Sequence, residues 1–125
     1  MADFNDALSV SASGLRAQST RLKHLSENIA NVDTPGYRRK MVHFDPAENG
    51  AIKVGDIQLD QSDLDKIYDP SHPLADQNGN YMGSNVNILF EIADAREAQR
   101  SYEANLKLFD QARQMSTNLM DLLKR

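Results

Sequence analysis

Four aspartates gather in the middle of the sequence, where carboxylates at short spacing could hold a calcium ion. They are Asp60, Asp63, Asp65 and Asp69. Their pattern does not fit the calcium loop of an EF-hand, which needs glycine at its sixth position and glutamate at its twelfth. The nearby segment DQNGNY (76–81) has alternating oxygen ligands, but its sixth position is Tyr81 and its twelfth is Asn87. We therefore expect a solvated acidic surface here and no metal site.

Catalytic residues are equally hard to find in this sequence. The three histidines are scattered over different predicted elements, at His24, His43 and His72. No two of them have the spacing of metal ligands. The chain has no cysteine, and it contains neither a nucleophile elbow nor a glycine-rich phosphate loop. The sequence thus predicts no catalytic residue, no cofactor and no metal.

The charges are unevenly distributed along the chain. Residues 41–85 carry eight acidic and two basic side chains, whereas the chain as a whole has a net charge of -4. The triplet Arg38, Arg39 and Lys40 is a weak signal for nucleic acid on an acidic protein, so we expect no nucleic-acid partner. No stretch approaches the roughly 20 apolar residues of a membrane span. The first residues lack the pattern of a signal peptide, so any export is expected to need no cleaved signal.

The first long segment has the pattern of an amphipathic helix. Two rows of residues recur at seven-residue spacing, as in the core of a coiled coil. One row is Leu8, Leu15, Leu22 and Ile29, and the other is Phe4, Ser11, Gln18, Leu25 and Val32. Pro35 cannot continue a helix, and the residue before it is pushed toward an extended conformation. We therefore predict a helix over residues 4–32.

The last part of the chain is also predicted to be helical, because residues 86–124 contain neither glycine nor proline. Ser84 or Asn85 is the expected N-cap. The apolar residues form two stripes, which are Ile88, Ile92, Ala95, Tyr102, Leu106 and Phe109 and then Leu108, Ala112, Met115, Leu119 and Leu122. Because the second stripe lies on an adjacent face, the helix is expected to contact two neighbouring surfaces.

The middle segment begins with short β-like runs, at Met41–Phe44 and Ala51–Leu59. Asn49-Gly50 lies between them and is a strong signal for a tight turn, so we predict a small hairpin. Residues 68–85 are rich in proline, glycine, asparagine and aspartate. This composition predicts a loop.

The stretch SENIANVDTPGYRRK (26–40) joins the first helix to the middle segment. Asn28 and Asn31 share one face of the helix, and their amides can donate and accept hydrogen bonds, which suits bonding to a neighbour's backbone. Residues 34–37, Thr-Pro-Gly-Tyr, are typical of a turn, since proline presets one dihedral angle and glycine supplies a positive φ. A helix stop that is merely polar explains the same residues equally well.

Within that stretch, ENIANVDTPGYRR resembles the amino-terminal signature of the flagellar rod, hook and hook-associated axial family. The matching residues are Asn28, Ile29, Ala30, Asn31, Thr34, Pro35, Gly36 and Tyr37. The phrases HPLAD, SNVNILFEIADAREAQRSYEAN and DLLKR are similar to the second conserved segment of the same family, most of all in its C-type proximal-rod branch. The compact Thr-Pro-Gly-Tyr form departs from many members of that branch, which have a longer insert before the tyrosine.

The resemblance implies a fold that is mainly α. Two long terminal helices would form an antiparallel coiled coil, with a small β-hairpin and loop insert between them. We expect three segments: an N-terminal axial helix with its Thr-Pro-Gly-Tyr corner (1–40), a small acidic insert (41–85) and a C-terminal axial helix (86–125).

The resemblance also implies a role. The chain would be a structural subunit of the proximal rod of the flagellar basal body, polymerising through its terminal helices to build the drive shaft and export channel. Implied partners are further copies, the B-, F- and G-type rod subunits, the rod-base/ring junction protein, the inner-membrane ring and the flagellar type III export apparatus. The residues expected at subunit interfaces are Leu8, Leu15, Leu22, Leu25, Asn28, Ile29, Asn31, Thr34, Pro35, Gly36, Tyr37, Ile88, Ile92, Tyr102, Leu106, Phe109, Met115, Leu119 and Leu122.

Other functions compete with this interpretation. A B-type rod subunit of the same family would share most of these features. A coiled-coil adaptor or export chaperone that never polymerises would need the helices but not the corner. A small hydrolase or metal-dependent enzyme has only the scattered acids and histidines in its favour, and we expect no enzyme activity.

Overall fold

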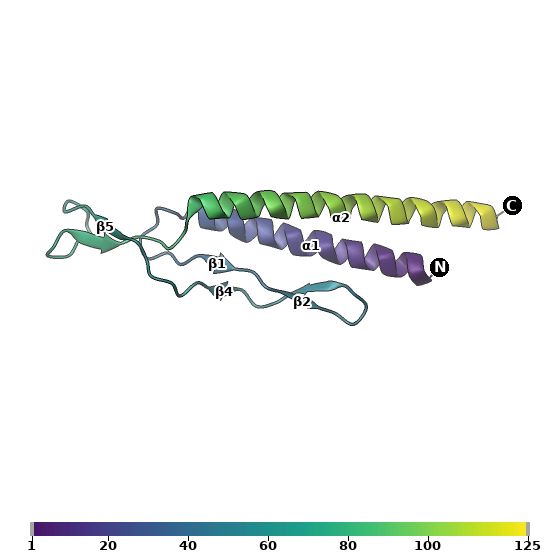
Figure 1. Ribbon diagram of the computed structural model, residues 1–125, viewed down its shortest axis with the longest axis horizontal. Helices are drawn as coiled ribbons and strands as arrows, with labels where there is room; N and C mark the ends of the chain where they lie inside the picture. Colours follow the sequence, from purple (N-terminus) through teal and green to yellow (C-terminus); the bar gives the residue numbers. More distant parts are fainter. Residues whose placement is uncertain (1, 125) are drawn as a thin grey trace.

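The computed structural model describes residues 2–124, with side chains from Phe4 onward, as a long and narrow molecule (Figure 1). The described residues form two long helices, α1 (Ala2–Ala30) and α2 (Ile88–Leu123), and six short strands. The chain is therefore mainly α with small β elements, as the sequence predicts.

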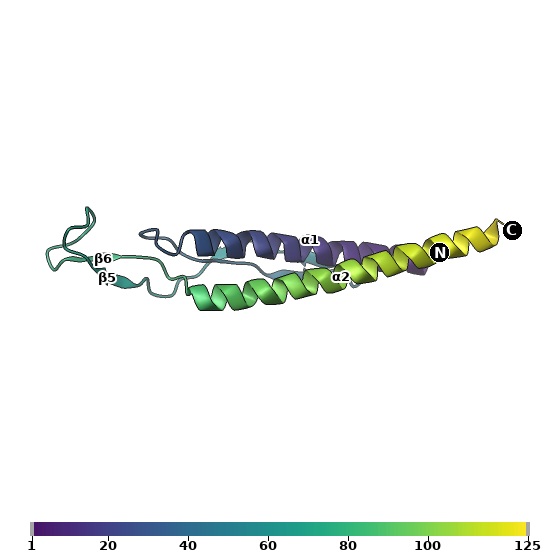
Figure 2. The same ribbon diagram turned by 90° about the horizontal axis from the view of Figure 1, so that it is seen from above.

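The two helices lie side by side and run in opposite directions (Figures 1 and 2). Contacts across the pair agree with this direction, because Gly14 lies against Asn105 and Asn28, further along α1, lies against Glu91. The start of α1 and the end of α2 therefore lie at the same end of the molecule. α2 continues past the start of α1 (Figure 2).

Small and polar side chains form the interface between the helices. On α2, the buried residues Glu91, Ala98 and Ala112 repeat at multiples of seven. On α1, Gly14 lies so close to α2 that a Cβ atom placed there would lie 2.5 Å from Oδ1 of Asn105. Such small residues let two helix backbones approach closely, but they bury little apolar surface. The helix pair consequently has a thin hydrophobic core.

Only one of the two predicted rows on α1 is buried within the chain. Ser11, Gln18 and Leu25 belong to the row that faces α2 and are buried. The leucine row, which holds the larger apolar side chains, is only half-buried. Its members are Leu8, Leu15, Leu22 and Ile29. The chain by itself thus leaves its strongest hydrophobic row incompletely covered.

The helix ends differ from the sequence-based expectation by a few residues. α1 ends at Ala30 rather than near residue 32. α2 begins after Asn87, whose Oδ1 accepts a hydrogen bond from the backbone N–H of Leu89 at 3.1 Å. The predicted caps, Ser84 and Asn85, were wrong, because their side chains are held by contacts with other parts of the chain.

The first part of the insert is a ribbon of two antiparallel strand pairs that folds back along α1 (Figure 1). Its strands are β1 (Lys40–Met41), β2 (Phe44–Pro46), β3 (Ile52–Val54) and β4 (Gln58–Leu59), with β2 paired to β3 and β1 to β4. Two residues (42–43) oppose three (55–57) between these pairs, which marks a β-bulge. Gly50 has a φ of 83° in the turn, so the predicted hairpin is confirmed.

The second part of the insert is a further hairpin, which corrects the prediction of a loop over residues 68–85. β5 (Lys66–Tyr68) pairs with β6 (Asn80–Met82) and projects beyond the opposite end of the helices (Figure 1). The intervening loop is held by Asp76, whose Oδ1 accepts from the backbone N–H groups of residues 78 and 80. The His72 ring stacks on Tyr81, with ring centroids 3.9 Å apart. These strands depend on non-local pairing, which the local composition does not reveal.

Neither helix in the described part of the chain is long and apolar enough to cross a membrane.

The close approach at Gly14 can be tested by Gly14→Val. The new side chain would displace the amide of Asn105, which donates to the carbonyl of Ser101. We therefore expect the free energy of unfolding to fall by about 1 kcal/mol. Urea denaturation followed by circular dichroism measures this. Ser9→Val on the exposed side of α1 controls for the helix propensity of valine. An equal loss in both variants would contradict the close-approach explanation.

Candidate functional site: a polar lock and an open apolar face

Residues 34–37 form the corner where the chain leaves α1. The backbone N–H of Tyr37 donates to the carbonyl of Thr34 at 3.2 Å, and Gly36 has a φ of 74°. Proline at the second position and a positive φ at the third are the features of a type II turn. The N–H of Gly36 also donates to the carbonyls of Met82 and Gly83, at 3.2 and 3.0 Å. The corner is therefore bonded to the end of β6.

Asn28 ties the end of α1 to the ribbon and the corner. Its side chain is fully buried. The amide Nδ2 donates to the carbonyl of Lys40 at 3.0 Å, and Oδ1 accepts from the N–H of the same residue at 2.9 Å. The amide therefore pairs with β1 as a neighbouring strand would. Oδ1 also accepts from the hydroxyl of Tyr37 at 2.8 Å.

A buried carboxylate adds α2 to this arrangement. Glu91 has no exposed surface, and its Oε1 accepts from Nε of Arg39 at 2.7 Å. Its Oε2 accepts from Nδ2 of Asn28 at 3.3 Å. Arg39 also reaches Asp60 with Nη1, 3.3 Å from Oδ2. A buried charge needs such partners, since an unpaired one costs several kcal/mol.

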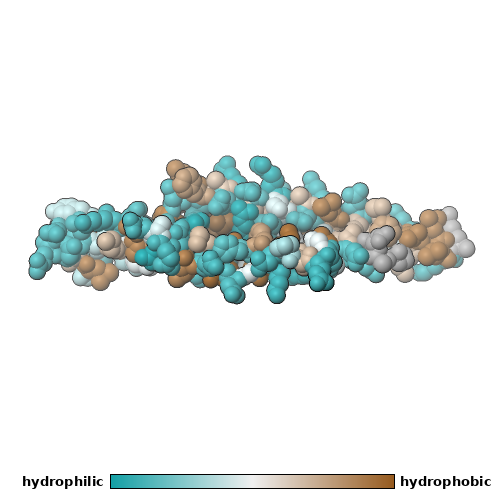
Figure 3. Space-filling view, turned by 60° about the horizontal axis from the view of Figure 1, so that its bottom comes forward, coloured by the Kyte–Doolittle hydropathy of each residue, from teal (hydrophilic) through white to brown (hydrophobic). Residues whose placement is uncertain are grey.

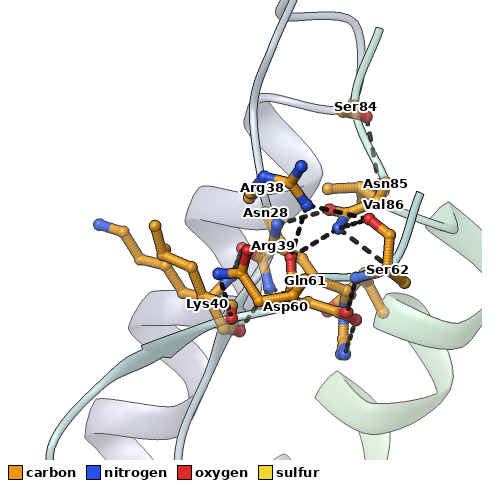
Figure 4. A network of polar contacts seen from close by, with 12 residues as sticks. Asn28, Arg38, Arg39, Lys40, Asp60, Gln61, Ser62, Ser84, Asn85 and Val86 are labelled. Atoms are coloured by element: carbon orange, nitrogen blue, oxygen red, sulfur yellow. Dashed lines mark hydrogen bonds and ion pairs between the residues drawn. The ribbon is translucent and has the colours of Figure 1, made fainter. Parts of the chain in front are cut away.

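Asn85 joins the segment before α2 to both sides of the ribbon (Figure 4). Its Oδ1 accepts from the N–H of Arg39 at 2.7 Å, and its Nδ2 donates to the carbonyl of Asp60 at 2.9 Å. Ser84 Oγ donates to the carbonyl of Val32 at the end of α1. We call the central cluster the polar lock, defined as Asn28, Tyr37, Arg39, Asp60, Asn85 and Glu91.

The electrostatics of the lock favour its charged groups. Burial works against the charge of Arg39, but its bonds to Glu91 and Asp60 outweigh this effect and raise its pKa. Hydrogen bonds from Ser62 lower the pKa of Asp60, with Arg39 adding to the effect. Burial raises the pKa of Tyr37, so its hydroxyl stays protonated and can donate to Asn28. The polar lock joins α1, the ribbon and the start of α2, and its described side chains offer no free nucleophile.

The two asparagines expected to bond a neighbour's backbone make their hydrogen bonds within the chain. Asn31 Nδ2 donates to the carbonyl of Glu27 at 2.8 Å, and its Oδ1 accepts from Oγ1 of Thr34 at 3.0 Å. These bonds fasten the last turn of α1 to the corner. Asn28, with its fully buried side chain, has no surface left for a neighbouring molecule.

Sequence reasoning missed Glu91, Arg39, Asp60 and Asn85 as parts of the site. One signal was available. Glu91 lies seven residues before Ala98, so a charged side chain stands in a row that otherwise faces α1. A charge in such a position needs a partner, but the sequence did not reveal that Arg39 supplies it.

A second feature is an apolar surface along one side of the helix pair, which we call the open face. On α2, Ile92 and Leu106 expose 40% and 41% of their surface. Leu15 and Tyr102 line one depression together with Arg16, which places Leu15 of α1 beside Tyr102 of α2. The open face comprises Leu8, Leu15, Leu22, Ile29, Ile88, Ile92, Tyr102, Leu106 and Phe109.

The ribbon covers part of another side of the helix pair. The N–H of Ile52 donates to Oγ of Ser13 at 3.0 Å, and near this point the ribbon turns back. Beyond the turn lies a groove of about 530 Å³, which we call the terminal groove. Its apolar lining includes Phe4, Val10, Leu108, Ala112 and Met115. In Figure 3, hydrophobic atoms gather toward this end of α2.

The other predicted interface residues occupy several environments. Leu25 is buried within the chain like Asn28. Thr34, Pro35 and Gly36 are exposed at the corner, and Tyr37 is half-buried. Met115 lines the terminal groove, while Leu119 and Leu122 lie near the end of α2. The described residues contain no group of three or more histidine, aspartate or glutamate side chains that could hold a metal ion.

Comparison with known proteins identifies the family. The family described as Flagella basal body rod protein matches residues 8–38, and Flagellar basal body rod FlgEFG protein C-terminal matches residues 77–122. The flagellar basal-body rod protein FlgC of Agrobacterium fabrum is 44% identical over 99% of this chain and 98% of its own length. The chain belongs to the FlgC family of flagellar basal-body rod proteins.

Two more FlgC proteins are similar over most of their length. That of Buchnera aphidicola subsp. Acyrthosiphon pisum is 34% identical over 85% of this chain and 88% of its own length. That of Escherichia coli O6:H1 is 32% identical over 90% and 92%. The FlgC family consists of structural rod proteins and not of enzymes. The family resemblance inferred from the corner and the carboxy-terminal phrases is thus confirmed.

The polar lock predicts a large effect of Glu91→Ala. The substitution leaves Arg39 and Asn28 without their partner, and we expect a loss of roughly 2–4 kcal/mol in the free energy of unfolding. Urea denaturation measures this loss. Glu97→Ala on the exposed side of α2 is the matched control and should cost less than about 1 kcal/mol. Similar losses in both variants would show that the contacts of Glu91 with Arg39 and Asn28 do not stabilise the fold.

The conformation of the corner predicts an unusual order of stability among variants at Gly36. No atom lies within 4 Å of a Cβ placed there, so only the positive φ opposes a side chain. Gly36→Ala should cost about 1–2 kcal/mol, and Gly36→Asn less, because asparagine tolerates this conformation better. Gly36→Val should be the worst of the three. Thermal denaturation compares them, and equal stabilities would contradict a strained corner.

Proposed function

We propose that this chain is a structural subunit of the proximal rod of the flagellar basal body and polymerises through its two terminal helices. The open face is the observation that carries the proposal. It places the larger apolar side chains of α1 beside an apolar stripe of α2, and the chain covers neither completely. A monomeric protein rarely exposes a long apolar surface unless another molecule covers it.

The energetic argument follows from what the chain buries by itself. Its buried hydrophobic residues are Ala17, Leu25, Val86, Ala98 and Ala112 within the described part. Three of these are alanines, which contribute little transfer free energy. Full burial of an exposed leucine or isoleucine contributes about 1.5–3 kcal/mol, so covering the partly exposed side chains of the open face would add apolar stabilisation that the single chain lacks. Assembly thus completes a core that the single chain leaves unfinished.

Within one subunit we propose that α1 and α2 form an antiparallel coiled coil. The support is the seven-residue spacing of the buried residues, with Ser11, Gln18 and Leu25 on α1 and Glu91 and Ala98 on α2. The helices cross at a shallow inclination (Figure 2), which suits ridges of one helix packing between those of the other. The polar lock holds the ribbon at a fixed place against this pair.

At the level of the assembly, copies stacked around an axis would form a tube that transmits torque and encloses the export path. Many interdigitated side chains resist twisting better than a few strong bonds do, since packed interiors deform little. The neighbours would be further copies, the B-, F- and G-type rod subunits, and the rod-base/ring junction protein with the inner-membrane ring. Passage through the flagellar type III export apparatus without signal cleavage completes the proposal, which locates the chain in the periplasm-spanning rod.

A coiled-coil adaptor or export chaperone that does not polymerise is the alternative from another class. The two functions differ in the role of the open face, because an adaptor would not use this face to associate with further copies of itself. A B-type rod subunit is the alternative within the family, and the FlgC names of the relatives speak against it.

The decisive variant is Leu106→Asp, which introduces a charge into the open face at a partly exposed position. We expect loss of concentration-dependent self-association in sedimentation velocity and loss of swimming when the variant replaces the normal chain. The charge would have to be desolvated at the interface, which costs several kcal/mol. Leu106→Asp with Phe109→Asp should enhance the defect.

Gln114→Asp is the matched control, because it adds the same charge to an exposed residue outside the open face and the terminal groove. It should leave both readouts unchanged. Normal rods and swimming in the Leu106→Asp strain would exclude polymerisation through this face and favour the adaptor.

A further inference from the structure

The open face and the terminal groove lie on opposite sides of the line where α1 meets α2. The contact row on α2 contains Ala98, Asn105 and Ala112. The open-face residues Ile92, Tyr102, Leu106 and Phe109 come one or four positions after a row member, whereas Leu108 comes three positions after one. With 3.6 residues per turn these offsets point to different flanks.

The linings of the two surfaces agree with this geometry. Leu15, Arg16 and Tyr102 line the depression in the open face. None of the residues that line the terminal groove is among them. The molecule therefore carries two separate apolar surfaces that share no lining residue.

The ribbon explains why the terminal groove is open only near the start of α1. It packs along α1 as far as Ser13, where it is bonded through Ile52. Phe4 and Val10 lie beyond that point and remain beside Leu108 and Met115 of α2. The chain thus covers this flank along the middle of α1 and leaves it open near the start of the helix.

Charge distinguishes the two surfaces as well. Among the described residues that line the terminal groove, Asp6 alone is charged. Among those that line the depression in the open face, Arg16 alone is charged. Both side chains are exposed. The terminal groove thus has an acidic edge and the open face a basic one, so the two apolar surfaces are complementary in charge.

We propose that the terminal groove of one copy receives the open face of a second copy, at Tyr102 and Leu106, with Asp6 of the first beside Arg16 of the second. This inference rests on the proposed polymerisation and specifies its contact between copies. The contact joins two different patches, so it is heterologous. Such a contact adds copies in one direction, and it leaves one terminal groove and one open face free at the ends of each growing series.

Engineered cysteines test the pairing directly, because the chain has none of its own. We would prepare Val10→Cys, in the terminal groove, and Leu106→Cys, on the open face. Each variant alone, and the two mixed, would be treated with a short thiol-specific cross-linker. The mixture should give at least about tenfold more cross-linked dimer than either variant alone, because the contact raises the local concentration of the two thiols. Val10→Cys mixed with Gln114→Cys is the control and should give no increase.

Two outcomes would overturn the inference. Efficient cross-linking of Val10→Cys with itself would show that grooves face grooves, as in a symmetric dimer. Equal yields from the Gln114→Cys control would show random collision. Sedimentation of the unmodified chain at the same concentration separates this inference from the proposed function: self-association without the specific cross-link defeats only the inference, whereas no self-association defeats both.

A charge exchange provides a second test that does not disturb the apolar residues. Asp6→Arg and Arg16→Asp should each lower the association constant by roughly two- to fivefold, as for exposed ion pairs. The double variant, with both changes in one chain, should recover most of the loss. Circular dichroism verifies that each variant keeps its helices. Additive losses in the double variant would contradict the proposed pairing.

Discussion

A fully buried carboxylate holds the parts of this molecule in place. Glu91 at the start of α2 contacts Asn28 of α1 and Arg39 beside the ribbon, so three segments distant in sequence converge on one side chain. The cluster is costly to break because loss of Arg39 would leave the buried carboxylate of Glu91 without its cationic partner. The path of the ribbon and the placement of the corner follow from these contacts.

The helix pair beyond the lock is built differently. Its interface uses glycine, serine and alanine, which bring the backbones together but bury little apolar area. Leu8, Leu15 and Leu22 of α1 remain half-buried, and Ile88 and Ile92 of α2 remain exposed. The polar lock fixes the shape of the subunit at one end, and the open face leaves apolar side chains along the helices for neighbouring subunits to cover. Both properties suit a subunit of a larger assembly. This division agrees with membership of a family of rod proteins.

Much of the fold could be predicted because it depends on local patterns. Pro35 and the spacing of the leucines indicated α1 and its end to within a few residues, and Asn49-Gly50 indicated the turn of the ribbon. The second hairpin could not be predicted, because β6 lies in a segment of turn-forming residues and is a strand only through its pairing with β5. The N-cap of α2 was misplaced for a similar reason, since Asn85 is held by Arg39 and Asp60.

The sequence by itself determined that two apolar helices flank an acidic insert, and its corner and carboxy-terminal motifs determined the family. Those properties reside in periodicity and in short motifs, which need no knowledge of distant contacts. Only the tertiary structure decided that Ser11, Gln18 and Leu25 are buried, because either of two neighbouring rows could face a partner helix and the packing of α2 selects one. It also decided that Asn28 bonds to the chain's own β1. A side-chain amide can form hydrogen bonds with any backbone segment, and only the fold determines which segment lies within reach.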